Sequence, residues 1–446
     1  MDVNTAITQD WLEIFAEQYH KDPWRTQVAN AIQKHGIQAA ALNNQHIADI
    51  PFTFSHEISS GPITHQRQSG RCWIFAGLNA LRIPLMQQHK IKEFEISQTY
   101  LMFWDKLEKA NYFLDNILQT LTEPLDSRIV SWLLQAPVQD GGQWDMLVNL
   151  IEKYGVVPKY LMPETHHSSQ SMMMNRILTL KLREDTFTLR TLYDQGATNS
   201  ELTERKMRMV ADIYQMLVHF LGEPPRTFTF EYRNEDNEFH QEMDLTPHTF
   251  YEKYIGIDLS DYVSLIHAPT ADKPYGRVYT VQFLGNVRGG HPVRYLNVET
   301  AVLKDAALNQ LLENEAVWFG CDVGKMSDRN LGIMDPALFD YALTLGVPFT
   351  LDKGARLDYG ESQMTHAMLL TGVNLVKGQP NRWKVENSWG PEPGNHGFFV
   401  MSDEWFDEYL YQVVVHKSRL PSELTSALQD DPVVLPPWDP MGSLAR

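Results

Sequence analysis

The chain has 446 residues, which is enough for two or three domains or for one enlarged core. Hydrophobic residues make up 43% of it and charged residues 21%, a composition that excludes a disordered chain or a fibrous repeat. The 38 Lys and Arg residues stand against 56 Asp and Glu residues, and the resulting net charge of −18 repels phosphate backbones and anionic membranes. We therefore do not expect nucleic acid as a partner.

The start of the chain and its cysteine content bear on location. No apolar run reaches the roughly 18 residues of a membrane helix, and the first residues lack the basic start and apolar stretch of a signal peptide. Only Cys72 and Cys321 are present, too few for a disulfide framework. These features predict a cytoplasmic protein with no membrane partner.

The first part of the sequence favours helices. Residues 1–50 predict a helical arm, in which Asp22 caps a helix that Pro23 begins and Gly36 ends. Between residues 51 and 164 the periodicity predicts a mostly helical lobe, with helices beginning near Cys72 and near position 97. Pro84 is expected to end or bend the first of these two helices.

The pattern changes in the second part. Residues 165–270 predict a helix over 200–221, a strand over 228–232 and a helix from 246. Strand signals dominate residues 271–425, with strands expected at 316–323, 366–373, 382–387, 397–401 and 412–416. From about Gln429 the chain is rich in proline and is not expected to form regular structure. A helical lobe followed by a β-rich lobe predicts the α+β class.

Cys72 is the first candidate for chemistry. Its helix is predicted to start at this residue, and the positive end of the helix dipole together with Arg71 is expected to favour the reactive thiolate. The alternative is that Cys72, like Cys321, is a small buried core residue. The GxGxxG, P-loop, GxSxG, HExxH and CxxC motifs of other enzyme classes are absent from the sequence.

A thiolate nucleophile needs an imidazole and a third group that orients the imidazole. His366 opens an apolar run that predicts a buried strand, and Asn387 ends a second strand-like run. Two neighbouring strands could bring these side chains together, with Trp389 shielding their hydrogen bond from water. The alternatives are a core histidine at 366 and a turn residue at 387.

Three segments together resemble the papain-like cysteine peptidases, and within them the aminopeptidase C and bleomycin hydrolase branch. They are Gln66–Trp73, Thr365–Met368 and Glu386–Gly390. Further segments are similar to the same branch, so that the resemblance covers essentially the whole chain: Gln139–Asp145, Thr270–Pro274, Trp318–Gly324, Arg356–Glu361 and Trp438–Gly442.

The resemblance implies a papain-like fold of two lobes. The N-terminal arm would span 1–50, the helical lobe with the nucleophile 51–164, and the β-rich, barrel-like lobe with the His and Asn 271–425. His366 follows Cys72 by about 150 residues more than in papain-like enzymes of ordinary size, and 165–270 is the natural insertion. In the family this insertion forms helical and hook subdomains that assemble six subunits, which implies a homohexamer. Ser69 stands where secreted relatives carry a disulfide cysteine, which fits an intracellular branch.

The resemblance also assigns roles to residues. Cys72 would be the nucleophile, His366 the general acid and base, and Asn387 the residue that orients His366. Gln66 has the family's spacing for the side-chain amide of the oxyanion hole. Gly141 and Gly142 would let an extended substrate pair with the enzyme backbone. The alternative is that these glycines form a simple turn. No metal or organic cofactor is implied.

The last segment, 426–446, would lie as an arm in the active-site cleft. In the resembling branch the terminal carboxylate of this arm meets the α-amino group of the substrate, which limits cleavage to N-terminal residues. The family pattern stops at the position of Ala445, and here Arg446 follows. A guanidinium next to the substrate ammonium would repel it. We therefore expect that Arg446 is trimmed or that the form carrying it is less active.

The resemblance thus implies a cytosolic cysteine aminopeptidase that removes N-terminal residues from peptides with broad specificity through a thioester. An endopeptidase on the same fold is the first alternative, and it requires that the arm leaves the cleft open. A non-catalytic hexameric scaffold is the second alternative. We weigh the second below the first because the nucleophile, base, orienting and oxyanion residue types are all present.

Overall fold

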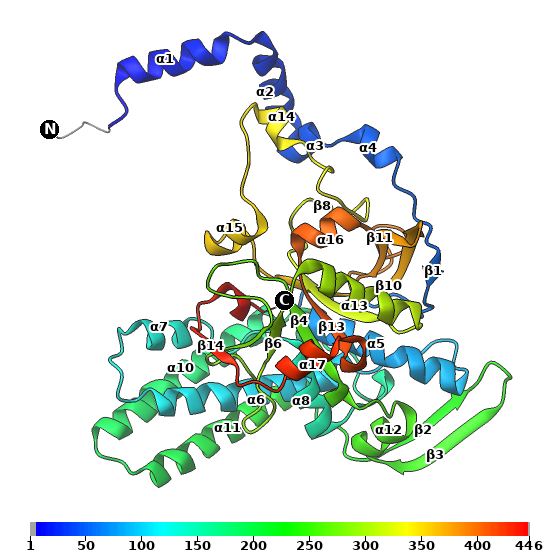
Figure 1. The fold of residues 1–446 in the computed structure, drawn as a ribbon. Helices are drawn as coiled ribbons and strands as arrows, with labels where there is room; N and C mark the ends of the chain where they lie inside the picture. The colour runs from blue at the N-terminus through cyan, green and yellow to red at the C-terminus, as the bar shows by residue number, and fades with distance from the viewer. Residues whose placement is uncertain (1–5, 445–446) are drawn as a thin grey trace.

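The computed structural model describes residues 6–444. Its N-terminal segment is a helical arm of α1 (Gln9–His20), α2 (Pro23–His35), α3 (Ile37–Ala41) and α4 (Asn44–Ala48), followed by strand β1 (His56–Glu57). The Asp22 side chain caps α2 and Gly36 follows its end at φ 83°, as predicted. In Figure 1 the first two helices project away from the body of the molecule, and none of their residues is buried.

A helical lobe follows the arm. Its main helices are α5 (Cys72–His89), α6 (Gln98–Gln119), α7 (Arg128–Gln135) and α8 (Trp144–Tyr154), and the short turn η1 (Lys159–Leu161) closes it. Helix α5 is buried over most of its length because its side chains are apolar on nearly every face. Pro84 was expected to end or bend this helix. It does not end the helix, because α5 continues through Pro84 to His89.

The next segment adds two long helices and a hairpin. It comprises α9 (His166–Ser169), α10 (Met172–Asp194), α11 (Asn199–Leu221), β2 (Phe228–Arg233), β3 (Phe239–Leu245), α12 (Pro247–Tyr254) and η2 (Leu259–Asp261). Thr198 and Glu201 form a capping box at the start of α11, and Gly222 follows its end. Helix α11 packs against α10 and α6, while the β2–β3 hairpin extends to one side of the body (Figure 1).

The third part is built on one large sheet. Its strands are β4 (Tyr262–Ile266), β5 (Arg277–Val281), β6 (Tyr295–Asn297), β7 (Val317–Cys321), β8 (Ser327–Asp328), β9 (Ile333–Met334), β10 (His366–Val376), β11 (Gln379–Glu386), β12 (Phe398–Ser402), β13 (Leu410–His416) and β14 (Val433–Leu435). They lie in the order β14-β5-β6-β4-β13-β7-β10-β11-β12-β9-β8, with β1 on β10. Helices accompany the sheet at α13 (Thr300–Leu312), α14 (Tyr341–Leu345), α15 (Lys353–Asp358), α16 (Asp403–Tyr409) and α17 (Ser422–Ala427), together with η3 (Lys417–Arg419).

The two lobes meet where α5 packs against β10. The indole N–H of Trp318 in β7 donates to the carbonyl of Trp73 in α5 at 3.2 Å, so the contact includes a directed hydrogen bond. In the same interface, Trp144 of α8 lies with its ring centroid 6.2 Å from that of Trp318. The start of α5 and the start of β10 are therefore held at one fixed place, and both carry candidate site residues.

The C-terminal segment contains two short regular elements. The expectation that it lacks regular structure is wrong for part of it, because β14 pairs in parallel with β5 and η4 (Pro440–Gly442) follows. The Asp439 carboxylate lies 3.0 Å from the ammonium of Lys273, and Trp438 packs on the Arg128 guanidinium at 3.6 Å. These contacts give the prolines a fixed path over the protein.

The predicted α+β class, with a helical lobe before a β-rich lobe, is confirmed by this architecture. Within residues 6–444 no helix is both long and apolar enough to cross a membrane.

Candidate functional site

Cys72 is the first residue of α5 and is fully buried. The backbone N–H groups of Ala367, Trp73 and Cys72 itself act on its thiol and lower its pKa. The first of these groups belongs to β10 and directly follows His366, so the thiol sits against the strand that carries the predicted base. The other two are N–H groups of the first helical turn, which have no partner inside the helix.

His366 and Asn387 are brought together by the sheet. Strands β10 and β11 are antiparallel neighbours, and the His366 Nε2 lies 2.9 Å from the Asn387 Oδ1. The Trp389 ring lies over this pair, with its centroid 4.9 Å from that of the imidazole. Because Nε2 is engaged by the amide oxygen, Nδ1 is the imidazole nitrogen left for the thiol. The predicted neighbourhood of His366, Asn387 and Trp389 is thus present in the structure.

Burial dominates the electrostatics of the thiol and the imidazole. It raises the pKa of Cys72 to about 12, against the three backbone N–H groups that lower it. Burial likewise lowers the pKa of His366 to about 4, against the hydrogen bond that its imidazole donates to Asn387, which raises the pKa. Each group is therefore neutral at rest when taken by itself, and a proton that moves from Sγ to Nδ1 creates two charges that stabilise each other.

Arg71 does not favour the thiolate as its place next to Cys72 suggested. Its guanidinium is buried and forms a two-point ion pair with Glu164, at 2.8 and 3.1 Å. Ser69 also accepts a hydrogen bond from the Arg71 Nε at 2.9 Å. The charge of Arg71 is thus used to attach the loop before Cys72 to the segment after α8.

Gln66 is buried beside the same loop. Its Nε2 donates to the Ser69 carbonyl at 2.6 Å, and its Oε1 accepts from the Ser388 hydroxyl at 2.6 Å. Its backbone N–H donates to the carbonyl of Ser388 at 2.8 Å. Ser388 is the residue that directly follows Asn387. These bonds fix the direction of the Gln66 amide, and its role as a donor to the substrate oxygen stays a prediction.

Gly141 and Gly142 lie in a buried loop before α8. A Cβ on Gly142 would come within 2.4 Å of the Trp73 ring, so a side chain cannot be placed there without moving the indole. The Gly141 carbonyl accepts a hydrogen bond from the Lys109 ammonium at 2.6 Å. These contacts explain why glycine is needed at 142, and the role of both residues in substrate pairing stays a prediction.

Asp140 also supports the site, although the sequence analysis assigned it no role of its own. Its carboxylate accepts hydrogen bonds from the Lys106 ammonium at 2.6 Å and from the Gly70 N–H at 2.9 Å, and the Ser171 hydroxyl donates to it as well. These contacts hold its pKa well below the ordinary value, although burial raises it. Asp140 thus fixes the turn at Gly70 that leads into Cys72. Its place in the Gln139–Asp145 segment, which resembles the same branch, was the sequence feature that could have identified it.

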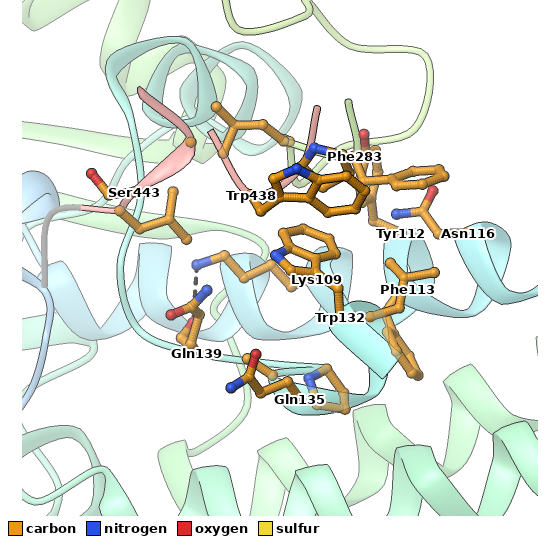
Figure 2. A pocket seen from close by; sticks show the side chains of 18 of the residues that line it. Lys109, Tyr112, Phe113, Asn116, Trp132, Gln135, Gln139, Phe283, Trp438 and Ser443 are labelled. Carbon is orange, nitrogen blue, oxygen red and sulfur yellow. Dashed lines mark hydrogen bonds between the residues drawn. The ribbon is translucent and has the colours of Figure 1, made fainter. Parts of the chain in front are cut away.

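The C-terminal arm is bound close to the start of the strand that carries His366. The Ser443 carbonyl accepts from the Gln143 side chain at 2.8 Å, and the Ser443 hydroxyl donates to the Met364 carbonyl at 2.9 Å. Together with the helical lobe the arm lines a cavity of about 580 Å³, in which Trp438, Trp132 and Lys109 face one another (Figure 2). Ala445 and Arg446 lie outside the described residues, so the expectations about them stay predictions.

Cys321 lies in β7 directly opposite His366 in the strand pairing, and it is fully buried. Burial raises the pKa of its thiol, which agrees with its interpretation as a core residue. Within residues 6–444 no three His, Cys, Asp or Glu side chains gather closely enough to hold a metal ion.

The model of the Peptidase C1-like family matches residues 6–442. The chain belongs to the Peptidase C1-like family.

This chain aligns with several known proteins over nearly its full length. It is 52% identical to an aminopeptidase C of Listeria monocytogenes over 99% of this chain and all of the relative. It is 43% identical to the bleomycin hydrolase of Gallus gallus, with 91% of each chain covered. A crystal structure of PepW from Lactobacillus rhamnosis is 51% identical, with a TM-score of 0.98 over 99% of this chain and all of that one. The resemblance inferred from the sequence motifs is confirmed.

Proposed function

We propose that this peptidase is a cysteine aminopeptidase that removes N-terminal residues from peptides through a thioester intermediate. The observation that carries the proposal is the arm held between Gln143 and Met364, two residues before His366, because an arm there blocks one end of the cleft. The aminopeptidase C relatives, which align over their full length, support the same activity.

Acylation begins with proton transfer from the Cys72 Sγ to the His366 Nδ1. The thiolate attacks the carbonyl carbon of the scissile amide, and the negative charge passes to the carbonyl oxygen. The Cys72 N–H and the Gln66 amide are the donors that we assign to this oxyanion. When the carbon–nitrogen bond breaks, His366 gives its proton to the leaving amine, and the thioester remains on Cys72.

Deacylation uses the same groups in reverse. His366, neutral again, takes a proton from a water molecule, and the hydroxide attacks the thioester carbon. The carbon–sulfur bond breaks, the released amino acid takes the hydroxyl, and the proton returns from the imidazole to the thiolate. Asn387 keeps Nδ1 directed at the sulfur throughout, because its Oδ1 holds Nε2.

The arm limits each cleavage to the removal of one N-terminal residue. A substrate that enters the cleft meets the arm on the side of Gln143, so that there is space for one residue before the scissile bond. The buried Met441 and the Lys273–Asp439 ion pair keep the arm in place against the pull of a longer substrate. Broad specificity follows if the arm and the backbone make most of the contacts.

The deciding experiment compares a short peptide amide that has a free N-terminus with its N-acetylated twin, using Cys72→Ala as the blank. Cleavage of the free peptide alone is expected. A variant that ends before Trp438 should then cleave the acetylated twin as well, provided that circular dichroism shows an unchanged fold. Efficient cleavage of the twin by the full chain would instead indicate an endopeptidase, and no Cys72-dependent cleavage would indicate a scaffold.

We also propose a cytoplasmic hexamer. Two helices present apolar side chains to solvent in the single chain, which is a costly arrangement unless another subunit covers them. On α1 these side chains are Trp11, Leu12, Ile14, Phe15 and Tyr19, and on α10 they are Met172, Met173, Ile177, Leu180, Phe187 and Tyr193. The two reduced cysteines and the net charge of −18 suit the cytoplasm.

A further inference from the structure

A second cavity lies next to the catalytic loop and has no lining residue in common with the cavity beside the arm. It measures about 380 Å³ and is lined by His65, Arg67, Gln68, Ser169, Gln170 and Arg329. Every one of these side chains is polar, and two of them carry a permanent positive charge. A polar, cationic recess of this kind is suited to an anionic group.

The backbone of this cavity is tied to the active site on two sides. His65 pairs with Trp389 in an antiparallel bridge, and the Gly390 N–H donates to the Thr64 carbonyl at 3.1 Å. On the other side Gln68 bridges to Gln170. The cavity is therefore built from the same loop that leads into Cys72, and its position relative to the nucleophile is fixed.

Arg67 stands in this loop with an unusual backbone conformation. Its φ of 57° is in the left-handed region, which disfavours a residue with a Cβ. The His65 Nδ1 accepts the Arg67 N–H at 2.9 Å and so stabilises the turn. Arg67 is exposed, and the turn directs its side chain to the cavity instead of the protein interior.

The two guanidinium groups are not neutralised. Within residues 6–444 neither Arg67 nor Arg329 has a carboxylate within ion-pair distance, although the chain as a whole carries a charge of −18. Glu392 is the acidic side chain that acts on His65 from nearby. Burial lowers the pKa of His65, and so does Arg67, so that the imidazole is neutral at pH 7. The cavity keeps a net positive charge.

The cavity lies close to His366, on the side of Trp389. The Arg329 guanidinium packs on the Trp389 ring at 4.9 Å, and that ring lies 4.9 Å from the imidazole of His366. Arg329 is thus within about 10 Å of the group that protonates the leaving amine, a span of roughly three extended residues. Because the arm is bound at Gln143 and Met364, we expect the leaving segment to run to the other side of His366, where Trp389 and Arg329 lie.

We propose that Arg67 and Arg329 form a binding site for a carboxylate on the leaving segment of the peptide, two or three residues beyond the scissile bond. This inference rests on the proposed aminopeptidase activity and names its preferred substrates. The carboxylate has two sources, the free C-terminus of a tripeptide or tetrapeptide and an acidic side chain in a longer peptide. The enzyme therefore favours short peptides with a free C-terminus and longer peptides with Asp or Glu at these positions.

The test measures kcat/KM for matched substrates in one enzyme. The first pair is a neutral tetrapeptide with a free C-terminus and its C-terminal amide, and the second is a longer amidated peptide with Glu or Gln as the third residue of the leaving segment. We expect the carboxylate to raise kcat/KM about five-fold in both pairs, mainly through KM, because an exposed ion pair contributes up to about one kcal/mol. The preference should fall in 0.5 M salt.

The variants R67Q and R329Q should each reduce this ratio, and the double variant should abolish it. Because the ratio compares two substrates of one enzyme, a change in turnover cancels. Arg208→Gln, on the exposed face of α11, removes the same charge elsewhere and should keep the ratio. An equal kcat/KM for acid and amide, or a ratio unchanged in the double variant, would overturn the proposal. Cleavage of an amino acid p-nitroanilide, which has no carboxylate, reports separately whether the enzyme is an aminopeptidase.

Discussion

The contact between His366 and Asn387 shows what one amide contributes to the site. The Asn387 Oδ1 accepts from the imidazole and also from the Ser388 N–H at 2.8 Å, so the amide cannot rotate freely. An uncharged acceptor fixes the ring without stabilising a permanently protonated imidazole. A buried carboxylate in its place would hold the proton on His366 more tightly and would weaken it as an acid.

Asn387→Ala should lower kcat about ten- to hundred-fold and change KM little, because the imidazole loses its orientation while the substrate contacts remain. Steady-state kinetics on an amino acid p-nitroanilide give both constants. Asn381→Ala removes an amide of the same type from an exposed part of β11 and is the control. A fall in kcat of less than three-fold in Asn387→Ala would contradict the orienting role.

The lowered pKa of His366 also affects stability. The unfolded chain takes up a proton near pH 6.5 and the folded protein only near pH 4, so the free energy of unfolding falls as the pH drops through this window. The contribution of His366 to this loss is about 3 kcal/mol at pH 4. Urea unfolding at pH 7 and at pH 4.5 should therefore show a smaller loss for His366→Gln than for the wild type. The comparison variant is His219→Gln, at an exposed position of α11.

At the scale of elements, one buried ion pair joins the helix of Cys72 to β11, the strand that ends just before Asn387. The Glu386 Oε1 accepts from the Asn79 amide at 2.8 Å and from the Arg82 guanidinium at 3.1 Å, and both donors lie on α5. Arg82 and Glu386 are each about 1% exposed. Since Glu386 directly precedes Asn387, this contact sets the distance between the nucleophile helix and the orienting residue.

Glu386→Gln should destabilise the protein by about 3 kcal/mol, because it leaves a buried guanidinium without its counter-charge. The double variant Arg82→Met and Glu386→Gln should recover part of this loss. Glu204→Gln breaks an exposed ion pair with Arg208 and should cost less than about 1 kcal/mol. Chemical denaturation gives the free energy of unfolding of all three variants. Equal losses for Glu386→Gln and Glu204→Gln would refute the stabilising role of the buried ion pair.

The course of α5 through Pro84 shows how packing overrides a local rule. Proline removes one backbone hydrogen bond from a helix, so the sequence favours an end or a bend at this position. In the structure Ile83 and Leu85 on either side are buried in the core. Ending the helix there would expose these side chains to water, at a larger cost than one lost hydrogen bond.

At the scale of the whole molecule, the exposed apolar faces of α1 and α10 carry the prediction of an assembly. The paired variant Trp11→Asp and Phe187→Asp places charges on both faces and should reduce the molar mass measured by light scattering to that of smaller species. Glu17→Gln and Glu184→Gln, on the same two helices, are matched controls that should leave the mass unchanged. A monomeric wild type would refute the hexamer.

Local patterns in the sequence determined much of this protein. The caps at Asp22 and Gly36, the start of α5 at Cys72 and the strand that begins at His366 were predicted, because caps and periodicity depend on neighbouring residues. The second strand was predicted to end at Asn387, and it ends one residue earlier, at Glu386. The motifs around these residues also identified the family. The boundaries proposed for the domains and the roles proposed for the site residues stay predictions.

The tertiary structure alone decided which groups act on Cys72. Arg71 is turned to Glu164, the Gln66 amide is held by Ser69 and Ser388, and burial reverses the direction expected for the pKa of the thiol. The proline-rich arm gains a strand only because β5 offers an edge for pairing. These outcomes depend on partners from distant parts of the chain and on how completely packing excludes water, and neither quantity is encoded in the order of nearby residues.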